Sequence, residues 1–161
     1  MTITDVLPQG MTLRPAAEAD EPFLRHVYGT TRSDELAAMS WGEATREAFL
    51  DQQFTAQAVD YRRRFPEARF LVVEREGKPI GRLYLADSDD AVHVLDIALL
   101  PQHRGHGLGE ALLRWVAEGG RRLTLSVARW NPAQRLYLRL GFTVVADDGV
   151  YLAMERPAGD C

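Results

Sequence analysis

Apolar residues recur every three or four positions in four stretches of the chain, and this spacing predicts amphipathic helices. The stretches lie at residues 21–29, 43–65, 108–116 and 131–140. We expect Asp20 to cap the first helix, and the sequence from Ser40 to Glu43 has the spacing of a capping box for the second. Asn131 followed by Pro132 is typical of a helix start, so we expect the last helix to begin there.

Short apolar or alternating runs between these helices predict strands. They lie at residues 11–14, 70–73, 80–85, 92–100, 123–127, 142–146 and 150–155. Turn sequences at residues 76–79 and 88–90 join three consecutive strands as antiparallel hairpins. The helix between the strands at 92–100 and 123–127 forms a crossover, which joins parallel neighbours. The pattern therefore predicts an α/β fold with one mixed, largely antiparallel sheet flanked by helices.

The length of 161 residues corresponds to one domain. We expect a loose N-terminal tail at residues 1–10, the domain at 11–156 and a C-terminal tail at 157–161. Unbroken apolar runs, such as the one at 70–73, are far shorter than the ~20 residues needed to span a bilayer. The first ten residues also lack a signal-peptide pattern, so we expect a cytoplasmic protein with no membrane partner.

Charge and cysteine content exclude several kinds of chemistry. The net charge of −4 gives no general attraction for nucleic acid or an anionic membrane, and we read the basic run at residues 62–64 as a solvated helix end. Cys161 is the sole cysteine, which excludes a disulfide framework, a thiolate metal cluster and a buried catalytic cysteine.

The glycine-rich segment at residues 102–109 lies between a predicted strand and a predicted helix. Backbone N–H groups at such a helix start bind phosphate, although a flexible turn would use the same glycines. The segment lacks the Lys and Ser or Thr of a P-loop. A dinucleotide fingerprint starting at Gly105 would need glycine at the position of Glu110, so both of these phosphate motifs are excluded.

Two motifs resemble those of the GNAT superfamily of acetyltransferases. The pattern Gln-x-x-Gly-x-Gly from Gln102 to Gly107 is similar to the acetyl-CoA loop of that superfamily. Residues 131–142, with an opening Asn, an Ala, a Leu-Tyr pair and a closing Gly-Phe, resemble its second signature, although Asn131 and Tyr137 are six residues apart where many members have seven. The order of predicted elements over about residues 11–155 also coincides with that of the superfamily.

The resemblance implies the GNAT fold, with splayed central strands, and acetyl-CoA as cosubstrate. In that fold the N–H groups of residues 104–109 would hold the pyrophosphate, and the strand edge at residues 97–99 would pair with the pantetheine arm. A pantetheine amide gains ladder-type hydrogen bonds along an unpaired strand edge. The resemblance assigns cofactor binding to Ile97, Ala98, Leu99, Gln102, His103, Arg104, Gly105, His106, Gly107, Leu108, Gly109, Asn131, Ala133 and Tyr137.

Two interpretations of Tyr137 are possible from the sequence, one structural and one functional. On its helix it could be a core aromatic residue, whereas the resemblance places it near the cofactor sulfur. A phenol can donate a proton to a departing thiolate, so we take Tyr137 as the general acid.

Two residues are candidates for the base that deprotonates the acceptor amine. His93 resembles in place the general-base Glu of some superfamily members, and an ordinary imidazole pKa near 6.5 suits the task. Asp96, with an ordinary carboxyl pKa, suits it less. His93 could instead be a strand residue packed under the helix at 43–65. Strand alternation predicts that His93 and Asp96 face opposite sides of the sheet, and we therefore expect them to form no metal site with His103 and His106.

The superfamily admits its acceptor between the first two helices and the last hairpin. The helix at 43–65 presents polar and aromatic residues, from which we take Phe49, Gln53, Gln57 and Tyr61 as substrate-binding, although the same residues suit a packed and solvated helix. We therefore hypothesise acetyl transfer from acetyl-CoA to a small-molecule amine in a ternary complex. The alternatives are a non-catalytic acyl-CoA-binding or sensing domain, and acyl transfer to a hydroxyl or from a longer acyl-CoA. The acceptor's identity and the oligomeric state, including a homodimer, stay open.

Overall fold

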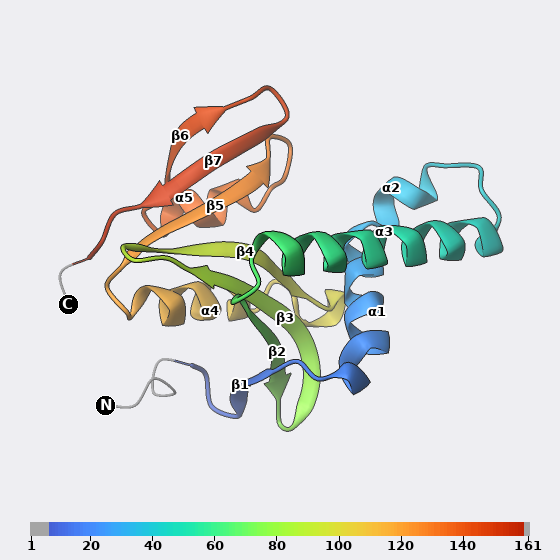
Figure 1. Ribbon diagram of the computed structural model, residues 1–161, viewed down its shortest axis with the longest axis horizontal. Helices are drawn as coiled ribbons and strands as arrows, with labels where there is room; N and C mark the ends of the chain where they lie inside the picture. The colour runs from blue at the N-terminus through green and yellow to red at the C-terminus, as the bar shows by residue number, and fades with distance from the viewer. Residues whose placement is uncertain (1–6, 160–161) are drawn as a thin grey trace.

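The computed structural model describes residues 7–159 as a seven-stranded sheet with helices on both faces (Figure 1). The strands are β1 (Met11–Pro15), β2 (Arg69–Arg75), β3 (Lys78–Asp87), β4 (Ala91–Leu99), β5 (Arg122–Ala128), β6 (Thr143–Asp147) and β7 (Tyr151–Arg156). The helices are α1 (Glu21–Thr31), α2 (Ser33–Ala37), α3 (Glu43–Arg64), α4 (Leu108–Ala117) and α5 (Gln134–Arg139), with short 3-10 turns η2 (Glu18–Asp20) and η3 (Pro101–His103). The predicted α/β fold with one mixed sheet is confirmed. The predicted tails and Cys161 lie partly or wholly outside the described residues, so the division into tails and domain stays a prediction.

The strands follow the order β1-β2-β3-β4-β5-β7-β6, and every neighbouring pair is antiparallel except β4 and β5. That parallel pair is joined through α4, as the crossover pattern predicts. Pairing between β4 and β5 runs from Ala91 opposite Arg122 to Val94 opposite Leu125, and the two strands then diverge (Figure 1). The second half of β4 therefore keeps β3 on one edge and leaves its other edge open.

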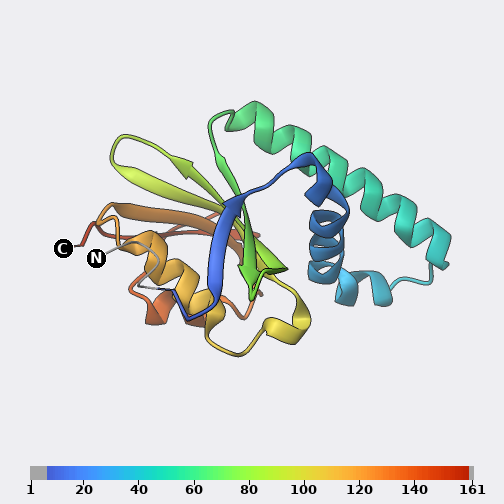
Figure 2. The ribbon, with the colours of Figure 1, turned by 90° about the horizontal axis from the view of Figure 1, so that it is seen from below.

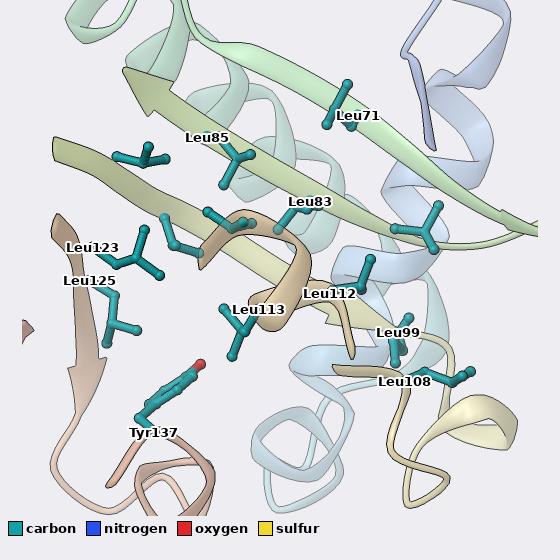
Figure 3. Close-up of a cluster of buried hydrophobic side chains, with 14 of the residues drawn as sticks. Leu71, Leu83, Leu85, Leu99, Leu108, Leu112, Leu113, Leu123, Leu125 and Tyr137 are labelled. Carbon is teal, nitrogen blue, oxygen red and sulfur yellow. The ribbon is translucent and has the colours of Figure 1, made fainter. Parts of the chain in front are cut away.

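Two separate apolar clusters cover the two faces of the sheet. One lies under α4 and α5 and is built largely from leucine and valine (Figure 3). The other packs α1 and α3 against β2 and includes Leu24, Tyr28, Leu50, Phe54 and Val72. Figure 2 shows α1 and α3 on one side of the strands and α4 on the other.

A β-bulge interrupts β4 at Leu95. Tyr84 of β3 lies opposite Asp96 and Leu85 lies opposite Val94, so Leu95 has no partner in the register. An extra residue of this kind shifts the alternation of side chains by one position. The hydroxyl of Tyr61 on α3 donates a hydrogen bond of 3.2 Å to the carbonyl oxygen of Leu95, which ties the bulge to the helix above it.

The bulge places His93 and Asp96 on the same face of the sheet. His93 stacks on Phe65, the residue that ends α3, and Asp96 bonds Arg82, whose guanidinium also reaches Gln57 of α3. The prediction that the two side chains face opposite sides is therefore wrong, because regular alternation holds only in a strand without an inserted residue.

Helix starts differ from the sequence predictions in two places. Gly42 precedes α3 and no side chain caps this helix, so the predicted capping box from Ser40 does not form; the short α2, which the pattern did not predict, comes before it. α5 begins at Gln134, and Asn131 instead accepts a hydrogen bond of 2.9 Å from the N–H of Ala133 in the preceding turn. Local hydrogen bonding by Asn in a turn competes with helix initiation.

Asp20 stands directly before α1, but its carboxylate turns away from the helix. Its two oxygens accept hydrogen bonds from Nη1 and Nη2 of Arg14, each at 2.7 Å, and the N–H of Ala17 adds a third at 2.7 Å. These bonds stabilise the charged form and lower the pKa of Asp20 to about 2. Asp20 thus joins the end of β1 to the start of α1.

No helix within residues 7–159 is both long enough and apolar enough to cross a membrane. The cytoplasmic location stays a prediction.

We expect Asp20→Asn to lower the free energy of unfolding by about 2 kcal/mol at pH 7. The folded-state pKa of Asp20 lies below the unfolded value, so its contribution is present above about pH 4 and is lost as the pH falls toward 2. Urea unfolding at pH 7 and pH 3 measures this, with the exposed Asp34→Asn on α2 as control. An equal deficit at both pH values would contradict the assignment.

Candidate active site

The loop from Pro101 to Gly107 connects the open end of β4 to α4. Gly105 and Gly107 adopt φ values of 78° and 77°, in the left-handed region that strains other residues. A Cβ atom at either position would meet no atom within 4 Å, so both glycines border open space. The backbone of this loop is therefore accessible to a ligand.

The start of α4 presents a row of unpaired donors. In the described part of the chain, the N–H groups of residues 105–109 donate to no backbone carbonyl. The N–H of Arg104 instead bonds the carbonyl oxygen of Pro101 at 3.2 Å, which narrows the predicted phosphate-binding segment by one residue. Unpaired N–H groups at a helix start carry partial positive charge and suit a phosphate group.

The side chains of this loop have different surroundings. Leu108 is buried in the main cluster, so only its backbone is available, whereas Gln102 and His106 are exposed and His103 is half-buried. Arg104 donates through Nε to the carbonyl oxygen of Leu99 at 2.9 Å and through Nη2 to Oγ1 of Thr30 at 3.2 Å. Arg104 therefore fastens the loop to both β4 and α1.

The open edge of β4 lies next to these donors. The N–H of Leu100 bonds the carbonyl oxygen of Ile80 on β3, so alternation directs the backbone groups of Ala98 to β3 and those of Ile97 and Leu99 to the open edge. Arg104 already occupies the carbonyl of Leu99. Of the three predicted residues, Ile97 thus offers the N–H and C=O that an extended ligand could pair with.

Tyr137 of α5 lies at the margin of the main cluster, 8% exposed, and its hydroxyl points into the cluster (Figure 3). Its ring packs on Phe142 with a centroid distance of 5.8 Å. Burial and the negative charge of Asp96 raise the pKa of Tyr137 to about 12. The phenol is therefore protonated at neutral pH.

Asp96 is held by a buried arginine that the sequence analysis did not identify. Arg82 is 1% exposed, and its Nη2 donates to Oδ2 of Asp96 at 2.6 Å and to Oε1 of Gln57 at 3.1 Å. The Tyr84 ring centroid lies 4.9 Å from the guanidinium carbon. In sequence, Arg82 lies between Gly81 and Leu83, and a charged residue in a strand is usually solvated, so no signal marked it as buried.

His93 lies where β4 and β5 are still paired, before the opening. Its Nδ1 is 2.6 Å from Oγ1 of Thr124, and its ring stacks on Phe65 at 6.1 Å. Burial, with a smaller effect of the Arg64 charge, lowers the pKa of His93. This environment matches the interpretation of His93 as a residue packed under the helix. The role of His93 as the base stays a prediction.

The predicted acceptor residues are divided between two places. Gln57 and Tyr61 line a cavity of about 600 Å³ between α3 and the β2–β3 surface. Phe49 packs instead on Trp41, with ring centroids 5.2 Å apart, and neither Phe49 nor Gln53 lines that cavity. The cavity wall also contains Arg82 and Tyr84 and is rich in aromatic rings, a lining typical of small-molecule sites.

Across residues 7–159, no three His, Cys, Asp or Glu side chains lie close enough together to hold a metal ion. The absence of a metal cofactor stays a prediction.

Comparisons with known proteins agree with this geometry. Residues 66–144 match the family described as acetyltransferase (GNAT) domain. A Bacillus subtilis (strain 168) protein, named as a ribosomal protein bS18-alanine N-acetyltransferase, is 38% identical over 82 residues, which cover 47% of this chain and 54% of that protein. The chain thus spans about half the length of this curated relative.

Solved structures show the same fold at low identity. PaiA N-acetyltransferase from Thermoplasma acidophilum, in complex with coenzyme A, has a TM-score of 0.67 and 19% identity over 91% of this chain and 98% of that one. An acetyltransferase from Thermus thermophilus has a TM-score of 0.66 and 24% identity over 91% and 96% of the two chains. At such identities the likeness shows the fold alone.

We expect Gly107→Val to weaken coenzyme A binding at least tenfold, because a branched side chain at positive φ strains the loop and fills the space before the free N–H groups. Gly149→Val, with φ 93° and open space in the β6–β7 turn, is the matched control and should bind normally. The thermal shift produced by coenzyme A measures both, and NAD should produce none. Equal stabilisation by NAD, or equal losses in both variants, would contradict the site.

Proposed function

The chain belongs to the GNAT acetyltransferase superfamily, and from this premise we propose that it transfers the acetyl group of acetyl-CoA directly to an amine. The observation that carries the proposal is the open edge of β4 beyond Val94, which includes Asp96 and lies beside the free N–H groups at the start of α4. A fold alone does not establish an activity, so the proposal rests on this arrangement of donors and titratable groups.

Acetyl-CoA would lie across the opening between β4 and β5. The N–H groups of residues 105–109 bind its pyrophosphate, and the backbone groups of Ile97 pair with a pantetheine amide in the manner of strand addition. Because backbone groups make these contacts, the side chains of the same residues can pack in the apolar cluster. This arrangement brings the thioester to the opening, where Tyr137 and Asp96 lie.

Acetyl-CoA supplies an activated acyl group, and the chain supplies positioning and proton transfer. The amine nitrogen forms a bond to the acetyl carbon while the carbon–sulfur bond breaks, and the sulfur leaves as a thiolate. The hydroxyl of Tyr137 hydrogen-bonds this sulfur and provides its proton as general acid, and the proton that the nitrogen loses as the amide forms restores the phenol. A phenol with a pKa of about 12 is fully protonated at neutral pH and therefore always able to donate.

His93 takes the proton that the acceptor must lose before it attacks, either directly or through water. Its lowered pKa keeps the imidazole uncharged at neutral pH, which is the form that accepts a proton. Asp96 is the other candidate, but its Oδ2 is fastened to Arg82 at 2.6 Å.

We propose a small amine as the acceptor, supported by the aromatic-lined cavity that Gln57 and Tyr61 border. The name of the Bacillus subtilis relative favours a second candidate, the N-terminal amine of a protein that begins with alanine. The family match at residues 66–144 leaves α1, α2 and the whole of α3 outside it, so the helices on the proposed acceptor side carry the difference between these candidates.

An acetylation assay tests the function. We expect acetyl transfer to members of a broad panel of small amines and little to a peptide that begins with alanine. Tyr137→Phe should lower kcat about 10- to 1000-fold with the KM for acetyl-CoA unchanged, because it removes a donor used in the transition state. The exposed Tyr151→Phe is the matched control. A peptide acetylated efficiently, with no small amine accepted, would identify a protein acceptor; a full rate in Tyr137→Phe would remove the general-acid role.

The acidic limb of kcat/KM should lie below pH 6.5, because burial lowers the pKa of His93 and the protonated imidazole cannot act as a base. His93→Ala should flatten this limb and leave coenzyme A binding intact, whereas His26→Ala on the exposed side of α1 should change neither. A limb that persists in His93→Ala and disappears in Asp96→Asn would transfer the role to Asp96.

A further inference from the structure

Arg82 is the largest fully buried side chain in the part of the chain that the structure describes. A buried guanidinium is unfavourable unless its charge is paired and its N–H groups are hydrogen-bonded. Only Nη2 is bonded, and Nε and Nη1 have no hydrogen-bond partner among residues 7–159. The rings of Tyr84 and Tyr28, at 4.9 and 5.8 Å from the guanidinium carbon, offset part of this cost. A buried guanidinium with two nitrogens that lack hydrogen bonds does not favour stability. A function explains its presence more readily.

The partner of Arg82 is the carboxylate at the opening between β4 and β5. Asp96 follows the bulge at Leu95, and its side chain is 17% exposed where that of Arg82 is 2%. Oδ2 accepts from Arg82 at 2.6 Å, whereas Oδ1 has no such fixed partner among the described residues: the nearby hydroxyl of Tyr61 donates to the carbonyl oxygen of Leu95, although it and Asp96 lie close enough to affect each other. One oxygen is therefore fixed from the protein side and the other is available to a ligand.

We propose that Arg82 is a positioning residue that fixes Asp96 at this opening, so that Oδ1 of Asp96 binds the ammonium group of the acceptor. The proposal rests on the function proposed above, because it places the acceptor nitrogen beside the thioester. Alkyl amines carry a proton at neutral pH, and a carboxylate next to the rings of Tyr61 and Tyr84 suits such a cation. Asp96 then binds the protonated amine, and proton removal falls to His93.

The ion pair also determines how the ammonium is recognised. Arg82 and Asp96 together carry no net charge, so the attraction for the ammonium acts at short range, through a charge-assisted hydrogen bond to Oδ1. Orientation of the carboxylate is then the property that matters, and Gln57 helps to fix it because its Oε1 accepts from the same Nη2 at 3.1 Å. Loss of Arg82 should therefore affect acceptor binding even where the carboxylate remains.

A purely structural role for the pair predicts a different result. The bonds between Arg82, Asp96 and Gln57 join β3, β4 and α3. If the pair only stabilised the fold, its loss would lower stability and weaken the binding of the acceptor and of acetyl-CoA alike. A positioning role affects only the acceptor, and only an acceptor that carries a positive charge. An alkyl amine such as propylamine and an aryl amine such as aniline, which is uncharged at neutral pH, separate the two roles.

Steady-state kinetics with both amines form the first arm of the test. We expect Asp96→Asn to raise the KM for propylamine at least tenfold, with the KM values for aniline and acetyl-CoA within threefold of wild type. Arg82→Lys, which keeps a cation but loses the fixed geometry, should show a smaller rise for propylamine alone. The matched control is the exposed pair Arg69 and Asp87, 2.9 Å apart on β2 and β3, whose variants Arg69→Met and Asp87→Asn should change no KM. Equal rises for both amines in Asp96→Asn, or no rise, would overturn the proposal.

The second arm measures binding without turnover, using propylammonium and the coenzyme A complex. We expect propylammonium to raise the melting temperature of the wild-type complex and not that of Asp96→Asn. If Asp96→Asn fails to fold because Arg82 is left unpaired, the double variant Arg82→Met with Asp96→Asn removes both charges and takes its place. A shift that is lost in the variant, in a protein that acetylates no amine, would support the ammonium site and reject the proposed function. A shift retained in the variant would reject the ammonium site whatever the activity.

Discussion

The divergence of β4 from β5 after Val94 is the constraint on which the rest of the site depends. A strand edge that faces no neighbour leaves N–H and C=O groups without partners, and inside a protein such groups are costly. The fold limits this cost with side chains: Arg104 occupies the carbonyl of Leu99, and the hydroxyl of Tyr61 occupies that of Leu95. What remains open is a short length of backbone centred on Ile97, next to the free N–H groups of α4.

The same divergence explains why charged and phenolic groups from both faces of the sheet affect one another. In a continuous sheet the strands would separate Asp96, on the α3 face, from Tyr137, on the α4 and α5 face. Burial, with a smaller effect of the Asp96 charge from across the diverging strands, raises the pKa of Tyr137. Burial and the same charge raise the pKa of Tyr61 from the other side. The charge of Asp96 thus helps to keep two phenols, Tyr137 and Tyr61, protonated.

Most of the fold could be predicted from the sequence because its elements carry strong local patterns. The strand runs around residues 70–73 and 80–85 and the helical stripe at 108–116 were placed within a few residues. The capping residues of α3 and α5 were misassigned, because Ser40 and Asn131 have side chains that occur in turns as well as at helix caps. The loop glycines were identified from spacing, and their positive φ values agree with that reading.

The candidate site was less predictable, because its arrangement depends on contacts between distant segments. The bulge at Leu95 has no local sequence signal, and without it His93 and Asp96 were assigned to opposite faces. A charged residue in a strand is usually solvated, whereas α3 covers Arg82 and Asp96 pairs with it. Such effects arise only when β3, β4 and α3 are assembled, so no window of sequence contains them.

The separation of the two apolar clusters by the sheet has a consequence for how this chain can change over evolutionary time. Substitutions in the cluster of α1, α3 and β2 share few neighbours with those in the cluster of α4 and α5, and effects of distant mutations on stability add nearly independently. Helices α1 and α3 can therefore diverge while the side of α4 and α5 stays intact. Arg104 limits this independence, because its hydrogen bond to Thr30 connects the loop to α1. Homologues in which α1 has changed should therefore keep this contact or replace it.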